Sequence, residues 1–143
     1  MTQRSIGICL GASNIKVVEL VRNNGEISHQ NSFVRSHGSN PRKALKEILD
    51  DLQINQDCLG TFTGRKFKDI VKAASITEAE AVEYALTYDR SYAPSSATGN
   101  VLVSLGAESF VAYLLNEDAT IAAIETGNKC ASGTGEFFLQ QLR

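Results

Sequence analysis

The sequence has no tryptophan, two prolines, two histidines and no long apolar run. A membrane-spanning helix needs about 18 or more consecutive apolar residues, so we expect no membrane segment and place the protein in the cytoplasm. Its three cysteines, Cys9, Cys58 and Cys130, are odd in number, far apart and free of any CxxC pair. This spacing argues against a disulfide framework or a self-contained zinc site, so a bound metal would need ligands from elsewhere.

The charges are few and nearly balanced, with 14 Lys and Arg against 16 Asp and Glu. The basic residues are scattered, so the chain lacks the positive field that nucleic-acid binding requires, and we expect no nucleic-acid partner. At 143 residues and 43% hydrophobic content, the chain has the size of one ordinary domain and enough apolar side chains for a core.

Short β-branched runs separated by glycine and asparagine dominate the first half and predict strands joined by tight turns. Asn40 and Pro41 are a helix cap and a first-turn proline in their preferred places. Ser75 and Thr77 each precede a glutamate by three residues, which is the spacing of a capping box. The predicted elements are strands at 5–10, 15–21, 26–34 and 58–63, a helix at 41–53, and a second helix ending near residue 89.

A segment rich in serine, alanine and glycine, 93–100, is the one linker-like stretch, and we place a boundary there between a first lobe, 1–92, and a second part, 101–143. In the second part, strands are predicted at 101–105, 110–115 and 119–125. The opening pattern returns about 95 residues on: Ile8-Cys9-Leu10-Gly11-Ala12 corresponds to Val103-Ser104-Leu105-Gly106-Ala107.

Both copies of this pattern end in a small glycine turn, at 11–14 and 106–109. In the first turn, backbone N–H groups could face a phosphate, with Ser13 and Lys16 adding side-chain donors; the alternative is a plain hairpin turn. Two such turns facing each other across a cleft would clamp phosphates. The candidate residues are Gly11, Ala12, Ser13, Lys16, Gly106 and Ala107.

A third glycine-rich stretch lies near the end of the sequence, where Cys130 precedes Gly133-Thr134-Gly135 and a predicted helix at 136–143. Unpaired N–H groups and the dipole of a helix N-terminus lower a thiol pKa and favour an anion, whether a metal cluster or a phosphate. The alternative is a buried cysteine beside glycines that serve only close packing.

These pieces together resemble the acetate kinase, sugar kinase, heat-shock chaperone and actin superfamily. Within it, they are similar to the activator ATPases of 2-hydroxyacyl-CoA dehydratases and benzoyl-CoA reductases. The resemblance covers essentially the whole chain, and its most specific part is the stretch around Cys130. It rests on Gly11 to Lys16, Thr63-Gly64-Arg65, Thr77-Glu78, Gly106, and Lys129-Cys130-Ala131-Ser132-Gly133-Thr134-Gly135 followed by Phe137.

The resemblance implies an α/β fold of the actin-like, ribonuclease H-like ATPase type, with the first lobe and the beginning of a second. It implies ATP or ADP with Mg²⁺ as ligands, with Gly133, Thr134 and Gly135 among the nucleotide-binding residues. It also implies a homodimer sharing one [4Fe-4S] cluster, with Cys130 as a ligand, and electron delivery to a CoA-ester dehydratase or reductase. The family's second cysteine lies beyond residue 143, so we expect this sequence to be part of a longer protein whose apolar second half a partner copy could cover.

The sequence departs from the family pattern where the family has an aspartate two residues before each glycine turn. Cys9 and Ser104 occupy those positions. Neither is a hard carboxylate, so we expect weak Mg²⁺ binding and weak hydrolysis and assign no catalytic residue. Three interpretations remain: an activator-type ATPase module, a degenerate non-hydrolysing module for docking or dimerisation in a larger activator, and a kinase-like fragment, against which Cys130 beside its glycines argues.

Overall fold

The computed structural model describes residues 2–55, 57–64, 70–92, 100–107 and 110–127. They belong to two compact units, Met1–Glu78 and Ala79–Arg143, which are described separately below. No helix in the described ranges is both long enough and apolar enough to cross a membrane.

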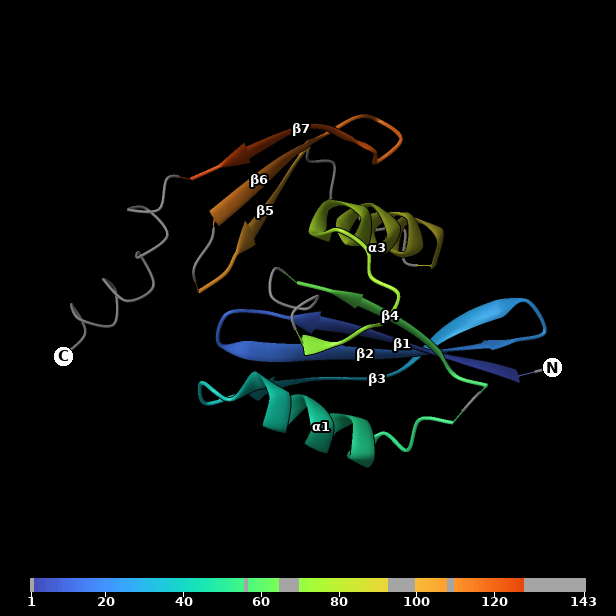
Figure 1. Cartoon of the computed structure of the whole chain (residues 1–143). Helices are drawn as coiled ribbons and strands as arrows, with labels where there is room; N and C mark the ends of the chain where they lie inside the picture. Colours follow the sequence, from blue (N-terminus) through green and yellow to red (C-terminus); the bar gives the residue numbers. More distant parts are fainter. Residues whose placement is uncertain (1, 56, 65–69, 93–99, 108–109, 128–143) are drawn as a thin grey trace. The chain divides into compact units, whose positions relative to one another are not determined.

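The first unit is built on a four-stranded sheet in the order β3-β2-β1-β4 (Figure 1). The strands β1 (Thr2–Leu10), β2 (Asn14–Asn23) and β3 (Glu26–Ser36) form an antiparallel meander, as predicted. Asn24 and Gly25 join β2 to β3 with φ angles of 51° and 88°, the positive values that two-residue hairpin turns require. The turn residues thus determine how β2 pairs with β3.

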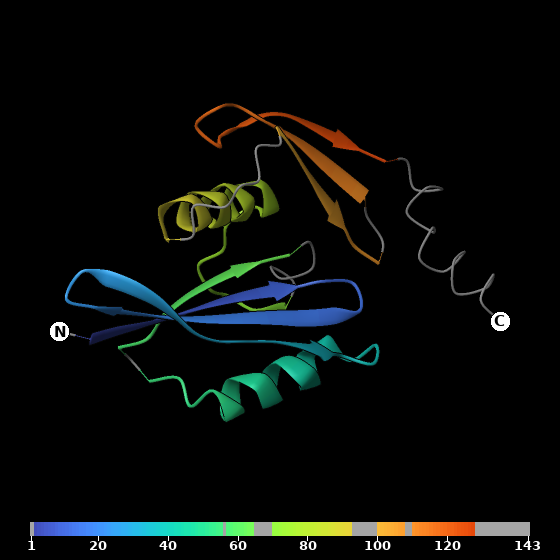
Figure 2. The same cartoon turned by 180° about the vertical axis from the view of Figure 1, so that it is seen from behind.

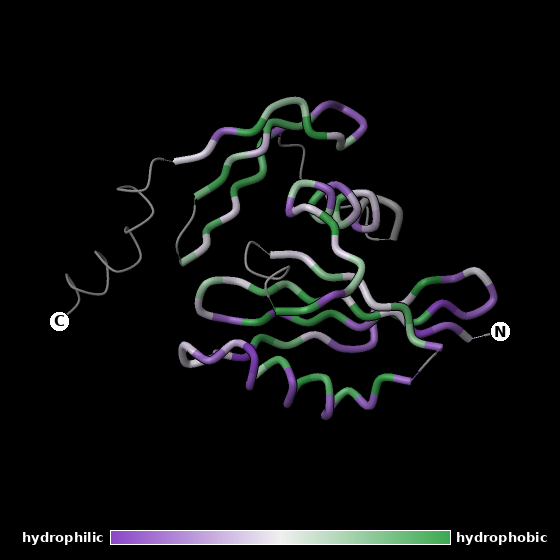
Figure 3. The backbone as a smooth tube through the Cα atoms, in the orientation of Figure 1, coloured by the Kyte–Doolittle hydropathy of each residue, from purple (hydrophilic) through white to green (hydrophobic). Residues whose placement is uncertain are grey.

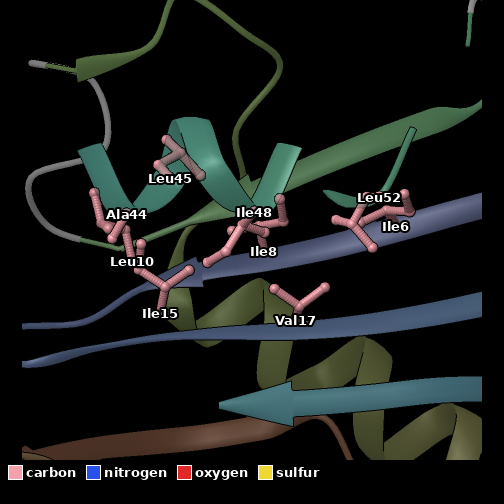
Figure 4. Close-up of a cluster of buried hydrophobic side chains, with 9 residues drawn as sticks. All are labelled: Ile6, Ile8, Leu10, Ile15, Val17, Ala44, Leu45, Ile48 and Leu52. Carbon is pink, nitrogen blue, oxygen red and sulfur yellow. The ribbon is translucent and has the colours of Figure 1, made fainter. Parts of the chain in front are cut away.

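Helix α1 (Pro41–Asp51) covers one face of this sheet, as Figures 1 and 2 show from opposite sides. Asn40 caps it: its Oδ1 accepts a hydrogen bond from the Lys43 backbone N–H at 3.2 Å. The apolar side of the helix packs on alternating residues of β1 and β2, and Figure 4 shows these side chains pointing toward one another. The buried cluster contains Ile6, Ile8, Leu10, Ile15, Val17, Ala44, Leu45, Ile48 and Leu52.

Strand β4 (Leu59–Thr63) lies parallel to β1 on its other side, which a connection through α1 allows and a tight hairpin does not. Cys58, predicted to be a core thiol, is half-buried and packs against the α1 cluster. Gly64 follows β4 with a φ of 120°. A Cβ atom on Gly64 would lie 2.2 Å from the Leu10 carbonyl oxygen, so glycine permits the carboxyl ends of β1 and β4 to lie together.

The second unit contains a three-stranded antiparallel sheet, with β5 (Val101–Leu105), β6 (Phe110–Leu115) and β7 (Ile121–Thr126) in sequence order. Helix α3 (Glu78–Tyr92) begins at the last residue of the first unit. Its apolar residues Ala79, Val82 and Leu86 pack on a buried row of β6, formed by Val111, Tyr113 and Leu115. The Glu83 carboxylate also accepts a hydrogen bond of 2.7 Å from the Ile121 backbone N–H.

These contacts group α3 with the second sheet, because its apolar residues find their buried partners on β6. The division into a first lobe, 1–92, and a second part, 101–143, stays a prediction. Residues 93–99 of the predicted linker lie outside the described residues. Of the remaining bounds, the strands agree with prediction to within three residues, and α1 ends at Asp51 rather than at residue 53.

Candidate functional site

The first glycine turn, Gly11 to Asn14, joins β1 to β2 at the carboxyl end of β1. The Gly11 N–H donates to the Asn14 carbonyl oxygen at 2.9 Å, so this amide is already used within the turn. The amides of Ala12 and Ser13 make no hydrogen bond to another described backbone group. A Cβ on Gly11 would lie 3.0 Å from the Asn14 oxygen, which explains the glycine. Successive free backbone amides of this kind can bind an anion.

His37, in the loop between β3 and α1, holds this turn by two hydrogen bonds that the sequence analysis did not anticipate. Its backbone N–H donates to the Ser13 carbonyl oxygen at 3.1 Å, and its ring Nε2 lies 3.3 Å from the Gly11 carbonyl oxygen. The ring Nδ1 is buried and has no hydrogen-bond partner within the described part of the chain. No spacing or motif marks His37 in the sequence, because its role depends on folding β3 back beside the turn.

One row across the sheet contains Cys9, Lys16 and Thr63, which lie on three neighbouring strands. Cys9 in β1 pairs with Lys16 in β2 on one side and with Thr63 in β4 on the other. Because side chains alternate along a strand, and the neighbours Ile8 and Leu10 face α1, this row lies on the opposite face. The Thr63 hydroxyl oxygen is buried and has no hydrogen-bond partner among the described residues. The register therefore brings together an ammonium, a thiol and an unsatisfied hydroxyl.

Burial dominates the electrostatics of Cys9 and raises the pKa of its thiol. The Lys16 charge lowers this pKa to a smaller extent, and the Glu78 carboxylate raises it. The side chain is therefore a neutral thiol at pH 7. Mg²⁺ prefers hard oxygen ligands, above all carboxylates, and a neutral sulfur next to a lysine provides none. The residues at this position do not fit the metal that the family resemblance implies.

The second turn is described only at its start, since Glu108 and Ser109 lie outside the described residues. Gly106 and Ala107 are exposed at the end of β5. The pairing of Leu105 with Phe110 closes this hairpin, and the Gly127 N–H donates to the Phe110 carbonyl oxygen at 3.0 Å. Ser104 is half-buried and offers a hydroxyl, so it too lacks a carboxylate for a cation.

The predicted cluster ligand Cys130 and the glycine stretch Gly133, Thr134 and Gly135 lie outside the described residues. Among the residues that the structure describes, no group of three or more His, Cys, Asp or Glu side chains could hold a metal ion. Cys9 and Cys58 are free thiols. The iron–sulfur assignment therefore stays a prediction.

Neither protein-family models nor curated proteins match this sequence. Solved structures do. The activator of the 2-hydroxyisocaproyl-CoA dehydratase from Clostridium difficile with bound ADPNP is 18% identical, with a TM-score of 0.67 over 94% of this chain and 49% of that one. An exopolyphosphatase from Cytophaga hutchinsonii is 13% identical, with a TM-score of 0.59 over 97% of this chain and 53% of that one.

A Ppx/GppA family member from Aquifex aeolicus is 10% identical, with a TM-score of 0.54 over 90% of this chain and 52% of that one. The chain thus spans about half the length of each of these proteins. These likenesses, together with the sheet order above, confirm the predicted α/β fold of the actin-like type.

Proposed function

We propose that this chain binds the phosphates of ATP or ADP at its first glycine turn and belongs to a cytoplasmic, activator-type ATPase whose hydrolysis is weakened. The observation that carries the proposal is the geometry of the turn. Ala12 and Ser13 leave their amides without backbone partners at the carboxyl end of β1, and Lys16 lies two residues beyond the turn on the adjoining strand. The structural likeness to an activator with bound ADPNP supports a nucleotide as the ligand.

The weakened hydrolysis follows from the residues at the aspartate positions. Hydrolysis of a nucleotide requires a metal ion to neutralise the developing charge and a group to orient the attacking water. Cys9 and Ser104 provide no carboxylate for either task. Phosphate binding through backbone amides needs neither group, so binding can persist where turnover is lost.

Binding can be tested by titrating the protein with ADP in a calorimeter and comparing Lys16→Ala with Lys43→Ala. Both lysines are exposed, but Lys43 is on α1, where its ammonium lies 3.9 Å from the Glu47 carboxylate. We expect Lys16→Ala to weaken ADP binding and Lys43→Ala to leave it unchanged. Equal affinity of the wild type and both variants would argue against the first turn as the binding site.

We further propose that the activator delivers electrons to a CoA-ester dehydratase or reductase through a [4Fe-4S] cluster shared by a homodimer, with Cys130 as a ligand. The support is the sequence around Cys130 and the structural likeness to a dehydratase activator. Anaerobic reconstitution of the longest available chain with iron and sulfide should produce cluster absorbance. Cys130→Ser should abolish this absorbance, whereas Cys58→Ser, at a half-buried thiol in the first unit, should preserve it.

The second candidate function is a non-hydrolysing module that dimerises, and the observation that favours it is the exposed face of β5. Val101, Val103 and Leu105 alternate along this strand with exposed fractions of 56%, 49% and 75%. Figure 3 shows that the residues along β5 and much of β6 are hydrophobic. β5 is an edge strand of the described sheet. It has neither the charged residue nor the proline that commonly protects such edges.

We take a second copy of this chain as the partner of β5, because an uncharged edge strand can pair with its own copy. Light scattering after size-exclusion chromatography tests this. Leu105→Lys should convert a dimer to a monomer, whereas Val34→Lys, at an exposed side chain of β3, should leave the dimer intact. A wild-type protein that is monomeric at all concentrations would contradict the dimer.

A further inference from the structure

We propose that the first turn takes its anion free of metal, with the ammonium of Lys16 in the place where a hydrated magnesium ion would neutralise phosphate charge. This inference rests on the phosphate-binding role proposed above and names the form of ligand that the site selects. The ligand class is a polyphosphate anion, such as uncomplexed ADP or tripolyphosphate.

The strand register provides the first step of the argument. Lys16 lies directly opposite Cys9 in the antiparallel pair of β1 and β2, and Cβ atoms so placed are about 4.5–5.5 Å apart. An aspartate at position 9 would be within reach of the lysine and would take up its charge. With cysteine there, Lys16 makes no ion pair with any carboxylate in the described ranges. Its positive charge is available for an anion.

The chemistry of the remaining ligands is the second step. The Cys9 thiol is neutral because burial raises its pKa, and Thr63, on the other side of Cys9, adds only an uncharged hydroxyl. Neither binds Mg²⁺ well, and the nearby ammonium repels it. The Thr63 hydroxyl can instead donate a hydrogen bond to a phosphate oxygen.

Glu78 is the one carboxylate that acts on Cys9 among the described residues, and it is the competing source of a metal ligand. If Glu78 replaced the missing aspartate, Mg²⁺ would strengthen nucleotide binding. If Lys16 replaces the metal, Mg²⁺ weakens binding, because complexing the phosphates removes the negative charge that the lysine attracts. The two arrangements therefore predict opposite effects of the metal.

The test is calorimetric titration of the full chain with ADP and with tripolyphosphate, each in excess EDTA and in excess Mg²⁺. We expect binding to be weaker in Mg²⁺ by about threefold or more, the size of one exposed charge interaction. Lys16→Ala should weaken binding in EDTA and remove the difference between the two conditions. Cys9→Asp should reverse the preference, so that Mg²⁺ now strengthens binding.

Lys43→Ala is the control, because it removes a positive charge on α1, outside the first turn, and should keep the wild-type preference. Thermal unfolding of each variant identifies any that fail to fold. Tighter binding in Mg²⁺ by the wild type, lost in Glu78→Gln, would overturn the inference while leaving the proposed function intact. Absence of binding in both conditions would overturn the proposed function and the inference together.

Discussion

The imidazole Nε2 of His37 lies 3.3 Å from the carbonyl oxygen of Gly11. Through this contact, the loop after β3 holds the turn between β1 and β2, and the His37 backbone N–H adds a second bond to the Ser13 oxygen at 3.1 Å. Since a carbonyl oxygen can only accept, the ring must donate from Nε2. The buried Nδ1 is then the unsatisfied atom. His37 is thus a positioning residue for the proposed phosphate turn.

Replacing His37 by glutamine or by asparagine distinguishes the roles of the two ring nitrogens. The amide nitrogen of glutamine reaches about as far as Nε2 and can still donate to Gly11, whereas that of asparagine corresponds to Nδ1 and cannot. We expect His37→Gln to keep most of the ADP affinity and His37→Asn to lose about threefold to tenfold, the range of one net hydrogen bond. Titration calorimetry measures this. Equal affinities of the two variants would contradict the positioning role.

Gly64→Ala should destabilise the first unit more than an ordinary glycine substitution. The new Cβ would lie 2.2 Å from the Leu10 carbonyl oxygen, and backbone atoms of β1 cannot move aside without disrupting the sheet. We expect a loss of about 2–4 kcal/mol in the free energy of unfolding, measured by urea denaturation.

Gly25→Ala is the matched control for this substitution. Gly25 also has a positive φ, 88°, but a Cβ added there would have no atom within 4 Å beyond its own chain neighbours. Only the backbone penalty of about 1–2 kcal/mol should remain. If both variants lose the same stability, the contact between Gly64 and Leu10 is not what requires glycine.

Ile48→Ala should be among the most destabilising core substitutions. Ile48 is fully buried in the α1 cluster, and removing its side chain leaves a cavity between helix and sheet. A loss of about 2–5 kcal/mol is expected. Val34→Ala, at a side chain that is 62% exposed on β3, should cost less than about 0.5 kcal/mol by the same measurement.

The raised pKa of Cys9 makes stability depend on pH in the alkaline range. The folded state holds the thiol proton more tightly than the unfolded chain, so the contribution of Cys9 is complete below the ordinary thiol pKa of about 8.5 and is lost as the pH rises through the folded pKa. Unfolding free energies of the wild type and Cys9→Ala between pH 7 and pH 10 test this. We expect the wild type to lose more stability than the variant; parallel curves would contradict the shift.

Most helices and strands, and the absence of carboxylates at the two aspartate positions, could be predicted from the residues alone. Turn residues such as Asn24-Gly25, the Asn40 cap and the apolar spacing along α1 act over a few residues, so local patterns predicted these elements closely. The substitution of Cys9 and Ser104 for carboxylates was equally plain, because a side chain's ligand chemistry does not depend on the fold.

Which distant residues meet is a property of the folded chain and could not be predicted in this way. The parallel placement of β4 beside β1 sets Thr63 next to Cys9, the course of the chain after β3 brings His37 to Gly11, and packing on β6 groups α3 with the second sheet. Such contacts join segments tens of residues apart and depend on how whole elements pack, so no local pattern encodes them.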